Sequence, residues 1–169
     1  MSLFDWRKYL QDNPNKYNWY ERGFNGCGDD QVAMAIPESL WVGSCISDIP
    51  DCVNHIVSAA KETAPAYKCG VYNYDQFDLP DPGYNTNFMD IFSCVIIKLL
   101  TLLRDKANYI YLHCNCGYSR SISVASTVAA AFNKTSVIHE LLKIQKQRSE
   151  VWPEPCYIIA GEFLNGEMK

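Results

Sequence analysis

The clearest pattern in the chain is a stripe of apolar residues between residues 88 and 103. Large apolar side chains recur at offsets of 0, 3, 4, 7, 8, 11, 12 and 15 residues from Phe88. This spacing places them on one face of a helix. The pattern predicts a helix over 88–103 with one buried face, opened by Thr86 or Asn87.

The sequence pattern predicts helices in three more segments. They differ from the first in being shorter, and each has a start or stop signal at its end. They are 121–132, rich in Ala, Val and Ser and ended by Asn133; the segment capped by Thr135 or Ser136 and running through Arg148; and Pro153–Leu164.

Short β-prone runs bounded by Gly, Pro and Asp occur before the helix at 88–103 and between it and the next helix. They lie at 39–43, 55–58, 67–72 and 108–112, and we expect each to be a strand. Strands that alternate with helices predict an α/β fold with a central, mostly parallel sheet that helices flank, covering both faces. The last strand, 108–112, runs into a loop and then into the helix at 121–132.

Chain length and composition favour one globular domain. The chain has 169 residues, of which 48% are apolar and 20% charged, an ordinary balance for a folded protein. Residues 1–36 differ from the rest of the chain in sequence pattern: we expect a short amphipathic helix near 2–10, followed by a polar stretch. We therefore interpret 1–36 as an N-terminal extension packed on the domain and 37–169 as the domain itself.

The charge balance limits the possible partners. Lys and Arg number 15 and Asp and Glu 19, which gives a net charge of −4 and no basic excess for binding nucleic acid or anionic lipid. No apolar run approaches the ~20 residues that span a bilayer, and the first ten residues carry charges where a signal peptide is apolar. We expect no nucleic-acid or membrane partner and a cytoplasmic location, with the nucleus as a second compartment.

The cysteines show no disulfide framework and no metal-binding spacing. There are eight, and a chain of this length has no need of disulfide bridges, so we expect reduced thiols. Cys114 and Cys116 are too close for a CxxC pair, and no second pair stands at ligand spacing. We therefore expect no metal and no cofactor. Six of the cysteines are interpreted as small buried apolar residues: Cys27, Cys45, Cys52, Cys69, Cys94 and Cys156.

The segment from Leu112 to Ser121 carries the most informative residues. It leaves a buried strand and enters a helix, so that its backbone N–H groups and the positive end of the helix point to one place. Such a place binds anions. We expect a phosphate or sulfate ion to be held there by the N–H groups of the loop, which belong to Asn115, Cys116, Gly117, Tyr118 and Ser119.

Four residues in this segment are of types that can take part in phosphoryl transfer. The N–H groups and Arg120 should stabilise a thiolate at Cys114, which would make it a nucleophile at neutral pH. Gly117 permits a tight turn, and the planar fork of Arg120 fits two oxygens of a phosphoryl group. Ser121 is placed to donate a hydrogen bond to the sulfur and so to make it a better leaving group.

These residues match the cysteine-dependent phosphatase signature His-Cys-x-x-Gly-x-x-Arg-Ser, and the chain resembles the dual-specificity phosphatase family. The likeness extends more weakly over residues 37–164, with Leu40–Gly43 similar to the family's first strand, Phe77–Asp81 to its acid loop and Gln147–Pro153 to the turn before its last helix. The resemblance implies a phosphatase P-loop between a central strand and a helix, and a cysteinyl-phosphate intermediate.

The resemblance also suggests roles for His113 and Arg148. It implies that His113 is a buried residue that hydrogen-bonds the loop and holds Cys114 in place. Arg148 resembles a family position that meets a second substrate phosphate, but it could equally be the solvated end of a basic helix. Both interpretations of Arg148 remain open.

A general acid must reach the loop from elsewhere in the chain, and three carboxylates are candidates: Asp75, Asp78 and Asp81. The family keeps its acid roughly thirty residues before the nucleophile, and Phe77–Asp81 has the form of the end of the acid loop. The resemblance therefore favours Asp81. The alternative is a structural role, in which Asp81 is the first residue of an Asp-Pro-Gly turn.

The neutral residues between Cys114 and Arg120 favour a substrate with one phosphate. Family members that act on inositol lipids or RNA ends tend to place cations there, and this chain has none. We expect a dual-specificity protein phosphatase acting on phosphotyrosine and on phosphoserine or phosphothreonine. The alternatives are a phosphopeptide-binding pseudophosphatase, a phosphatase of an RNA end, phosphoinositide or glucan, and a rhodanese-like or arsenate enzyme.

Overall fold

The computed structural model describes residues 31–61, 73–80 and 88–168. Several sequence expectations lie outside these residues: the helix near 2–10, the strand at 67–72 and the capping residues Thr86 and Asn87.

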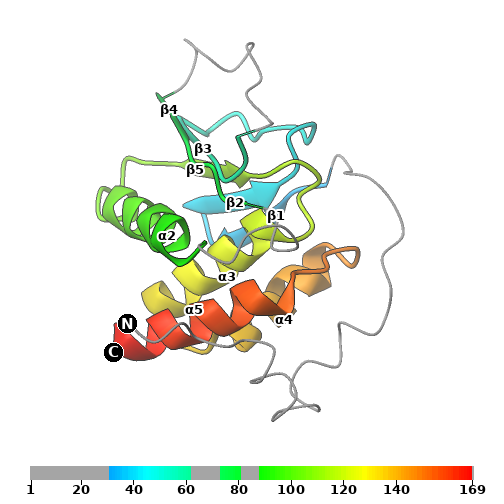
Figure 1. Cartoon of the computed structure of the whole chain (residues 1–169). Coiled ribbons are helices and arrows are strands. Elements are labelled where there is room, and N and C mark those ends of the chain that lie inside the picture. The colour runs from blue at the N-terminus through cyan, green and yellow to red at the C-terminus, as the bar shows by residue number, and fades with distance from the viewer. Residues whose placement is uncertain (1–30, 62–72, 81–87, 169) are drawn as a thin grey trace.

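A five-stranded sheet forms the centre of the molecule (Figure 1). Its spatial order is β1-β2-β5-β3-β4, and only the β1–β2 pair is antiparallel. The strands are β1 (Ala33–Ile36), β2 (Leu40–Gly43), β3 (His55–Ser58), β4 (Asn73–Gln76) and β5 (Ile110–His113). The prediction of a mostly parallel α/β sheet in a single domain is confirmed.

Strand β1 corrects the predicted domain boundary. Ala33–Ile36 was assigned to the N-terminal extension, yet it pairs with β2 through Ala33–Val42 and Met34–Trp41. The sheet therefore begins inside the range 1–36. Residues 1–30 of the predicted extension lie outside the described residues.

Four helices follow the predicted periodicity closely. Ser136 begins one of them by accepting a hydrogen bond from the N–H of His139 at 3.1 Å, as an N-cap does. Another ends at Asn133, as predicted, with Lys134 in the left-handed conformation at φ 57°. The helices are α2 (Met89–Leu103), α3 (Arg120–Asn133), α4 (Val137–Gln147) and α5 (Pro155–Glu167).

The two faces of the sheet are covered differently. Alternate strand residues such as Val42, Val57 and Leu112 belong to the large core that the helices complete, whereas Ile56 and Tyr111 point to a smaller cluster with Val53 and loop residues. In Figure 1 the described helices lie together on one side of the strands. Within the described residues, helices thus cover one face, and the expectation that they cover both is not met there.

Helix α3 is the central helix of the molecule and packs against both α4 and α5. Its small side chains allow this close packing: Ser121 through Ala130 are all buried. A Cβ added at Gly161 of α5 would lie 2.2 Å from Oγ1 of Thr127, so the α3–α5 contact requires a glycine there. The same helix begins at the predicted anion-binding loop.

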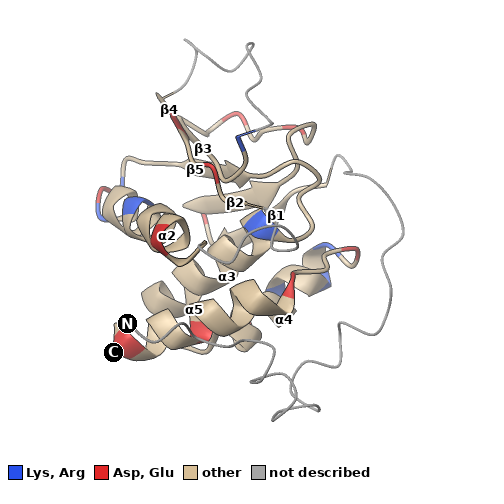
Figure 2. Cartoon of the chain, viewed as in Figure 1, with Lys and Arg blue, Asp and Glu red and all other residues tan. Residues whose placement is uncertain are grey.

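Charged residues do not form a field of one sign. Figure 2 shows basic and acidic residues scattered over the described ribbon. Among the described residues, no helix is both long and apolar enough to cross a membrane.

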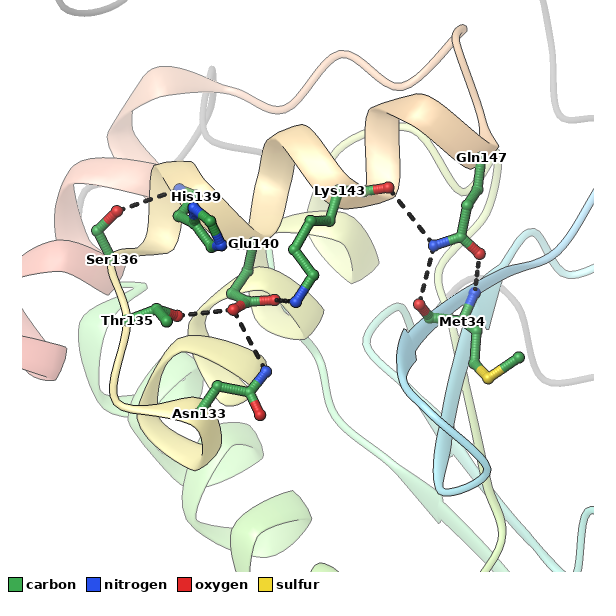
Figure 3. Close-up of polar contacts among 8 residues, drawn as sticks. All are labelled: Met34, Asn133, Thr135, Ser136, His139, Glu140, Lys143 and Gln147. Carbon is green, nitrogen blue, oxygen red and sulfur yellow. Dashed lines mark hydrogen bonds and ion pairs between the residues drawn. The ribbon is translucent and has the colours of Figure 1, made fainter.

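Glu140 joins the end of α3 to the start of α4 (Figure 3). Its side chain is 1% exposed and accepts hydrogen bonds from Lys143 at 2.7 Å, Thr135 at 2.7 Å and Asn133 at 3.3 Å. Burial acts to raise the pKa of this carboxyl, but the hydrogen bonds from Lys143, Thr135 and Asn133 outweigh it and hold the pKa below 4.5.

Gln147, at the other end of α4, fastens that helix to the sheet. Its amide Oε1 accepts a hydrogen bond from the N–H of Met34 at 2.8 Å, and its Nε2 donates to the Met34 carbonyl at 3.0 Å (Figure 3). Both bonds lie on the outer edge of β1, since the inner edge pairs with β2.

Replacing Glu140 with Gln tests the α3–α4 junction. At neutral pH the variant should lose about 1–3 kcal/mol of unfolding free energy, because charge-assisted bonds to a buried group are lost. The folded-state pKa is depressed, so this contribution is fully present above pH 4.5 and disappears as the pH falls through the folded pKa. Urea unfolding at neutral and acid pH should show the two proteins converging in acid.

Glu167→Gln, at an exposed position of α5, is the matched control and should change stability by less than about 0.5 kcal/mol. A gap between wild type and Glu140→Gln that stayed constant from neutral to acid pH would contradict the role given to the Glu140 charge.

Candidate active site

The predicted anion-binding loop, residues 114–119, lies between the central strand β5 and helix α3, and is called the Cys114 loop below. It starts where three parallel strands end together, since His113 pairs with Gly43 of β2 and with Ser58 of β3. This edge of a parallel sheet, next to a helix N-terminus, is where α/β folds bind anionic ligands.

The carbonyl groups of the Cys114 loop are held by the surrounding scaffold. Five of them have a hydrogen-bonding group of the protein at 2.6–3.0 Å. The pairs are Cys114 with His113 Nδ1, Asn115 with the Cys45 N–H, Gly117 with Arg148 Nη1, Tyr118 with the Trp152 N–H, and Ser119 with the Ser123 N–H.

The N–H groups of the loop are oriented by the same bonds. A carbonyl and the N–H of the next residue belong to one planar peptide unit and point in opposite directions, so the bound carbonyls of Cys114 and Asn115 direct the N–H groups of Asn115 and Cys116 away from the scaffold. Within the described residues, the N–H groups of Asn115, Cys116 and Gly117 donate to no protein acceptor. These N–H groups can therefore donate to a ligand.

Gly117 permits the loop to lie against the end of β2. Its φ is +73°, a conformation that favours glycine. A Cβ at this position would lie 2.5 Å from the carbonyl carbon of Gly43 and 2.6 Å from the N of Ser44. The tight turn predicted from the sequence is present, and it also brings two backbone segments into contact.

Cys114 lies at the base of the loop and is 3% exposed. Its Sγ is 3.2 Å from Oγ of Ser121, which in turn is 3.4 Å from the Gly43 carbonyl oxygen. The single proton of the Ser121 hydroxyl can be donated to the Gly43 carbonyl or to the sulfur, and the Cys114 thiol can in turn donate to Oγ of Ser121.

His113 and Tyr111 support the loop from the strand. His113 is fully buried, its Nδ1 is 3.0 Å from the Cys114 carbonyl oxygen, and its ring stacks on Tyr111 at 5.8 Å between centroids. Burial raises the pKa of the Tyr111 phenol far above its usual range, so its hydroxyl stays protonated. That hydroxyl donates to the Ser44 carbonyl at 2.6 Å.

Arg120 is the first residue of α3 and is half-buried. Its Nη1 donates to the carbonyl of Leu79 at 3.0 Å. Leu79 is itself fully buried. The structure therefore brings Arg120 together with the end of the segment that the sequence identified as an acid loop.

The three acid candidates are distinguished by their surroundings. Asp75 lies 2.7 Å from His55 Nε2 and 3.2 Å from Lys98 Nζ. Burial acts to raise its pKa, but His55 and Lys98 outweigh this and hold the pKa below 3.8. Asp75 is therefore ionised at neutral pH and unsuited to donate a proton.

Asp78 is exposed, with 61% of its side chain accessible and Lys61 Nζ 3.8 Å away. Asp81 lies outside the described residues. The described segment before it ends at Pro80. The Leu79 carbonyl accepts a hydrogen bond from Arg120, and the Pro80 carbonyl accepts one from the hydroxyl of Tyr157.

Arg148 contradicts both sequence interpretations. It is fully buried, so it is neither a solvated helix end nor accessible to a second substrate phosphate. Its Nη1 donates to Gly117 O at 2.6 Å, and its guanidinium carbon lies 5.7 Å from the centre of the Tyr118 ring. Arg148 therefore supports the carbonyl side of the Cys114 loop.

Several loop supports were not predicted, because they act through the backbone. Cys45 and Trp152 donate main-chain N–H groups to the loop, and the N–H of Glu154 donates to Oγ of Ser119 at 2.9 Å. The resemblance of residues 147–153 to a family turn gave a signal for Trp152, and Glu154 lies one residue beyond that range. Cys45 had no signal, since only the sheet register places it beside Asn115.

Other solved structures share this fold. No protein-family model matches the chain, and no curated protein matches it in sequence. The human tyrosine phosphatase-like serine/threonine/tyrosine-interacting protein is 14% identical, with a TM-score of 0.68 over 82% of this chain and 98% of that one. Human DUSP28 is 13% identical, with a TM-score of 0.68 over 85% and 99%.

A third structure, PTPMT1 in complex with PI(5)P, is 13% identical, with a TM-score of 0.66 over 82% of this chain and 97% of that one. The chain therefore has the fold of the dual-specificity phosphatases, and the resemblance drawn from its motif is confirmed at that level. No group of three His, Cys, Asp or Glu side chains suited to a metal occurs among the residues that the structure describes.

Replacing Arg148 with Met tests its supporting role. The variant should lose about 1–3 kcal/mol of unfolding free energy, because the buried Gly117 carbonyl loses its donor, and it should bind inorganic phosphate more weakly. Arg104→Met, at the C-cap of α2, is the control and should change neither property. Urea unfolding and calorimetric phosphate titration measure both. Weaker phosphate binding at unchanged stability would instead indicate direct contact with the ligand.

Proposed function

We propose that this protein is a phosphatase that hydrolyses phosphotyrosine and phosphoserine or phosphothreonine monoesters in proteins. The observation that carries the proposal is the Cys114 loop: five of its carbonyls are hydrogen-bonded by the scaffold, and the loop lies between a buried cysteine and an arginine at the start of a helix. This arrangement stabilises a negatively charged phosphoryl group in front of a nucleophile.

In the first step, the Cys114 thiolate attacks phosphorus and the bond from phosphorus to the leaving oxygen breaks. A carboxylic acid protonates that oxygen as it leaves, and we assign this role to Asp81. The N–H groups of the loop and Arg120 hold the three equatorial oxygens, whose charge is largest in the transition state. The products are the free hydroxyl side chain and a cysteinyl phosphate.

In the second step, water attacks the cysteinyl phosphate, and the carboxylate of the acid takes up the proton of the water. The bond from phosphorus to sulfur breaks, which restores the thiolate and releases inorganic phosphate. The hydroxyl of Ser121, 3.2 Å from the sulfur, stabilises the thiolate as it leaves.

The choice of a protein substrate rests on the sequence of the loop. Between Cys114 and Arg120 it carries no further cation, which suits a substrate with one phosphate. PTPMT1 was crystallised with a phosphoinositide, and a non-protein substrate is therefore the alternative to test. A phosphopeptide-binding pseudophosphatase is disfavoured because both Cys114 and Arg120 are present.

We also propose that the protein works in the cytoplasm, with the nucleus as a second compartment. The sequence supports a reducing environment, because the spacing of its eight cysteines shows no disulfide framework.

Two substitutions test the nucleophile and the arginine. Cys114→Ser should abolish turnover of para-nitrophenyl phosphate and of phosphopeptides while retaining their binding, since a serine hydroxyl stays protonated. Arg120→Lys should lower kcat/KM by about 10²-fold or more, because a point charge cannot replace the bidentate fork. Cys94→Ser on the exposed face of α2 is the control and should remain active, as should the wild type in EDTA. Substantial turnover by Cys114→Ser would refute the covalent mechanism.

Two further substitutions test the acid. Asp81→Asn should lower kcat by about 10²-fold for phosphoserine and phosphotyrosine peptides and flatten the basic limb of the pH–rate profile. The loss should be smaller for aryl phosphates whose leaving groups need little protonation. Asp78→Asn is the matched comparison, since it removes an exposed carboxylate three residues away. If only Asp78→Asn produces the pattern, the acid is Asp78.

A further inference from the structure

Tyr111 is a fully buried residue of the central strand β5, and its side chain contacts two different segments. Its ring stacks on that of His113, and its hydroxyl donates to the carbonyl of Ser44 at 2.6 Å. Burial raises the pKa of the phenol, so the hydroxyl keeps the proton that it donates. Tyr111 therefore joins the strand that leads into the Cys114 loop to the residues that follow β2.

A series of two peptide units starts at this hydroxyl. The carbonyl of Ser44 and the N–H of Cys45 belong to one planar unit and point in opposite directions. The Cys45 N–H donates to the carbonyl of Asn115 at 3.0 Å, and that carbonyl shares its own peptide unit with the N–H of Cys116. The series therefore runs from a buried hydroxyl through two peptide units and ends at an N–H of the loop.

The dipoles of this series all point the same way. In each peptide unit the oxygen faces Tyr111 and the N–H faces Cys116. Hydrogen bonds arranged head to tail polarise one another where the dielectric constant is low, and Tyr111 and Ser44 are both fully buried. Within the described residues the Cys116 N–H donates to no protein acceptor. The positive end of the series can therefore donate to a ligand.

The ring of Tyr111 acts on the neighbouring N–H group by a second route. His113 Nδ1 lies 3.0 Å from the carbonyl oxygen of Cys114, and this nitrogen must carry the proton, since a carbonyl oxygen only accepts. The same carbonyl shares a peptide unit with the N–H of Asn115. The stacked ring of Tyr111 holds His113, and His113 sets the direction of the Asn115 N–H.

We propose that Tyr111 is a positioning residue for the phosphoryl group, acting through two peptide units on the N–H of Cys116. Its hydroxyl fixes the direction of that N–H and increases the positive charge on it, which strengthens the hydrogen bond to a phosphoryl oxygen. The inference deepens the proposed function and rests on it only in taking a phosphoryl group as the anion. It gives a buried tyrosine of the sheet a part in the affinity of the loop for phosphate.

Replacing Tyr111 with Phe keeps the ring and removes the donor. Inorganic phosphate should bind the variant about 3- to 10-fold more weakly, the equivalent of one hydrogen bond. Calorimetric titration measures this at a temperature where urea unfolding shows both proteins to be folded. Tyr109→Phe, which removes a hydroxyl from a partly exposed tyrosine just before β5, is the matched control and should bind as wild type does. Equal phosphate affinity of Tyr111→Phe and wild type would overturn the inference, whatever the loss of stability.

Turnover separates this role from that of the general acid. All phosphate monoesters present the same phosphoryl oxygens to the loop. For Tyr111→Phe, kcat/KM should therefore fall by a similar factor, about 3 to 10, with a phosphoserine peptide and with para-nitrophenyl phosphate. The general acid acts on the leaving oxygen instead, and its removal affects phosphoserine most. A loss confined to the phosphoserine peptide would contradict an action on the phosphoryl group.

An NMR titration of the wild-type protein tests the series directly, even if the variant folds poorly. Added phosphate should move the amide proton of Cys116 downfield. The amide proton of Cys45 should move in the same direction by a smaller amount, because the hydrogen bonds of a series strengthen together. The amide proton of Met34, which is bonded to Gln147 outside the series, is the internal reference. Movement of the Cys116 proton without that of Cys45 would show that the two units are not coupled and would overturn the inference.

These outcomes distinguish the inference from the proposed function. If wild type binds phosphate, Tyr111→Phe binds it more weakly and neither hydrolyses a monoester, the proposed function fails and the role of Tyr111 in anion binding stands. If wild type hydrolyses monoesters and Tyr111→Phe equals it in phosphate affinity and turnover, the inference alone fails. If wild type binds no phosphate, both fail.

Discussion

The candidate site depends on the fastening of the Cys114 loop by its carbonyl groups. Without these bonds, the peptide units of the loop could rotate, and their N–H groups could bond water or other carbonyls of the loop. Here the carbonyls are bound by groups from β5, the loop after β2, helix α3, the C-cap of α4 and the turn before α5. These bonds fix the peptide units of the loop in the folded chain, so the cost of ordering the loop falls on folding.

This dependence explains the surrounding architecture. The small side chains of α3 let it lie close to α4 and α5, which brings Arg148 and Trp152 beneath the loop. Gly117 meets the end of β2 so closely that any side chain there would collide with Gly43. Helix α4, held by Glu140 at one end, delivers the buried Arg148 at the other.

The sequence predicted the elements with strong periodicity and missed those without it. Strands β2, β3 and β5 and all four described helices follow from apolar spacing. Strand β4, Asn-Tyr-Asp-Gln, is a partly exposed edge strand with no apolar alternation. In the site, Cys114, Arg120 and Ser121 were predictable because they are local in sequence. The true environment of Arg148 and the contacts of Tyr157 were not, since each joins segments 31 or more residues apart.

The side-chain amide of Gln147 affects whether β1 can pair with a strand from another molecule. An edge strand presents unpaired main-chain groups that can recruit a strand from another chain. At Met34 those groups are already taken by a side-chain amide with the same donor and acceptor as a peptide bond. Gln147, at the end of the helix that precedes Arg148, thereby occupies the position at Met34 where a further strand would pair, and Gln147→Ala would leave that position open.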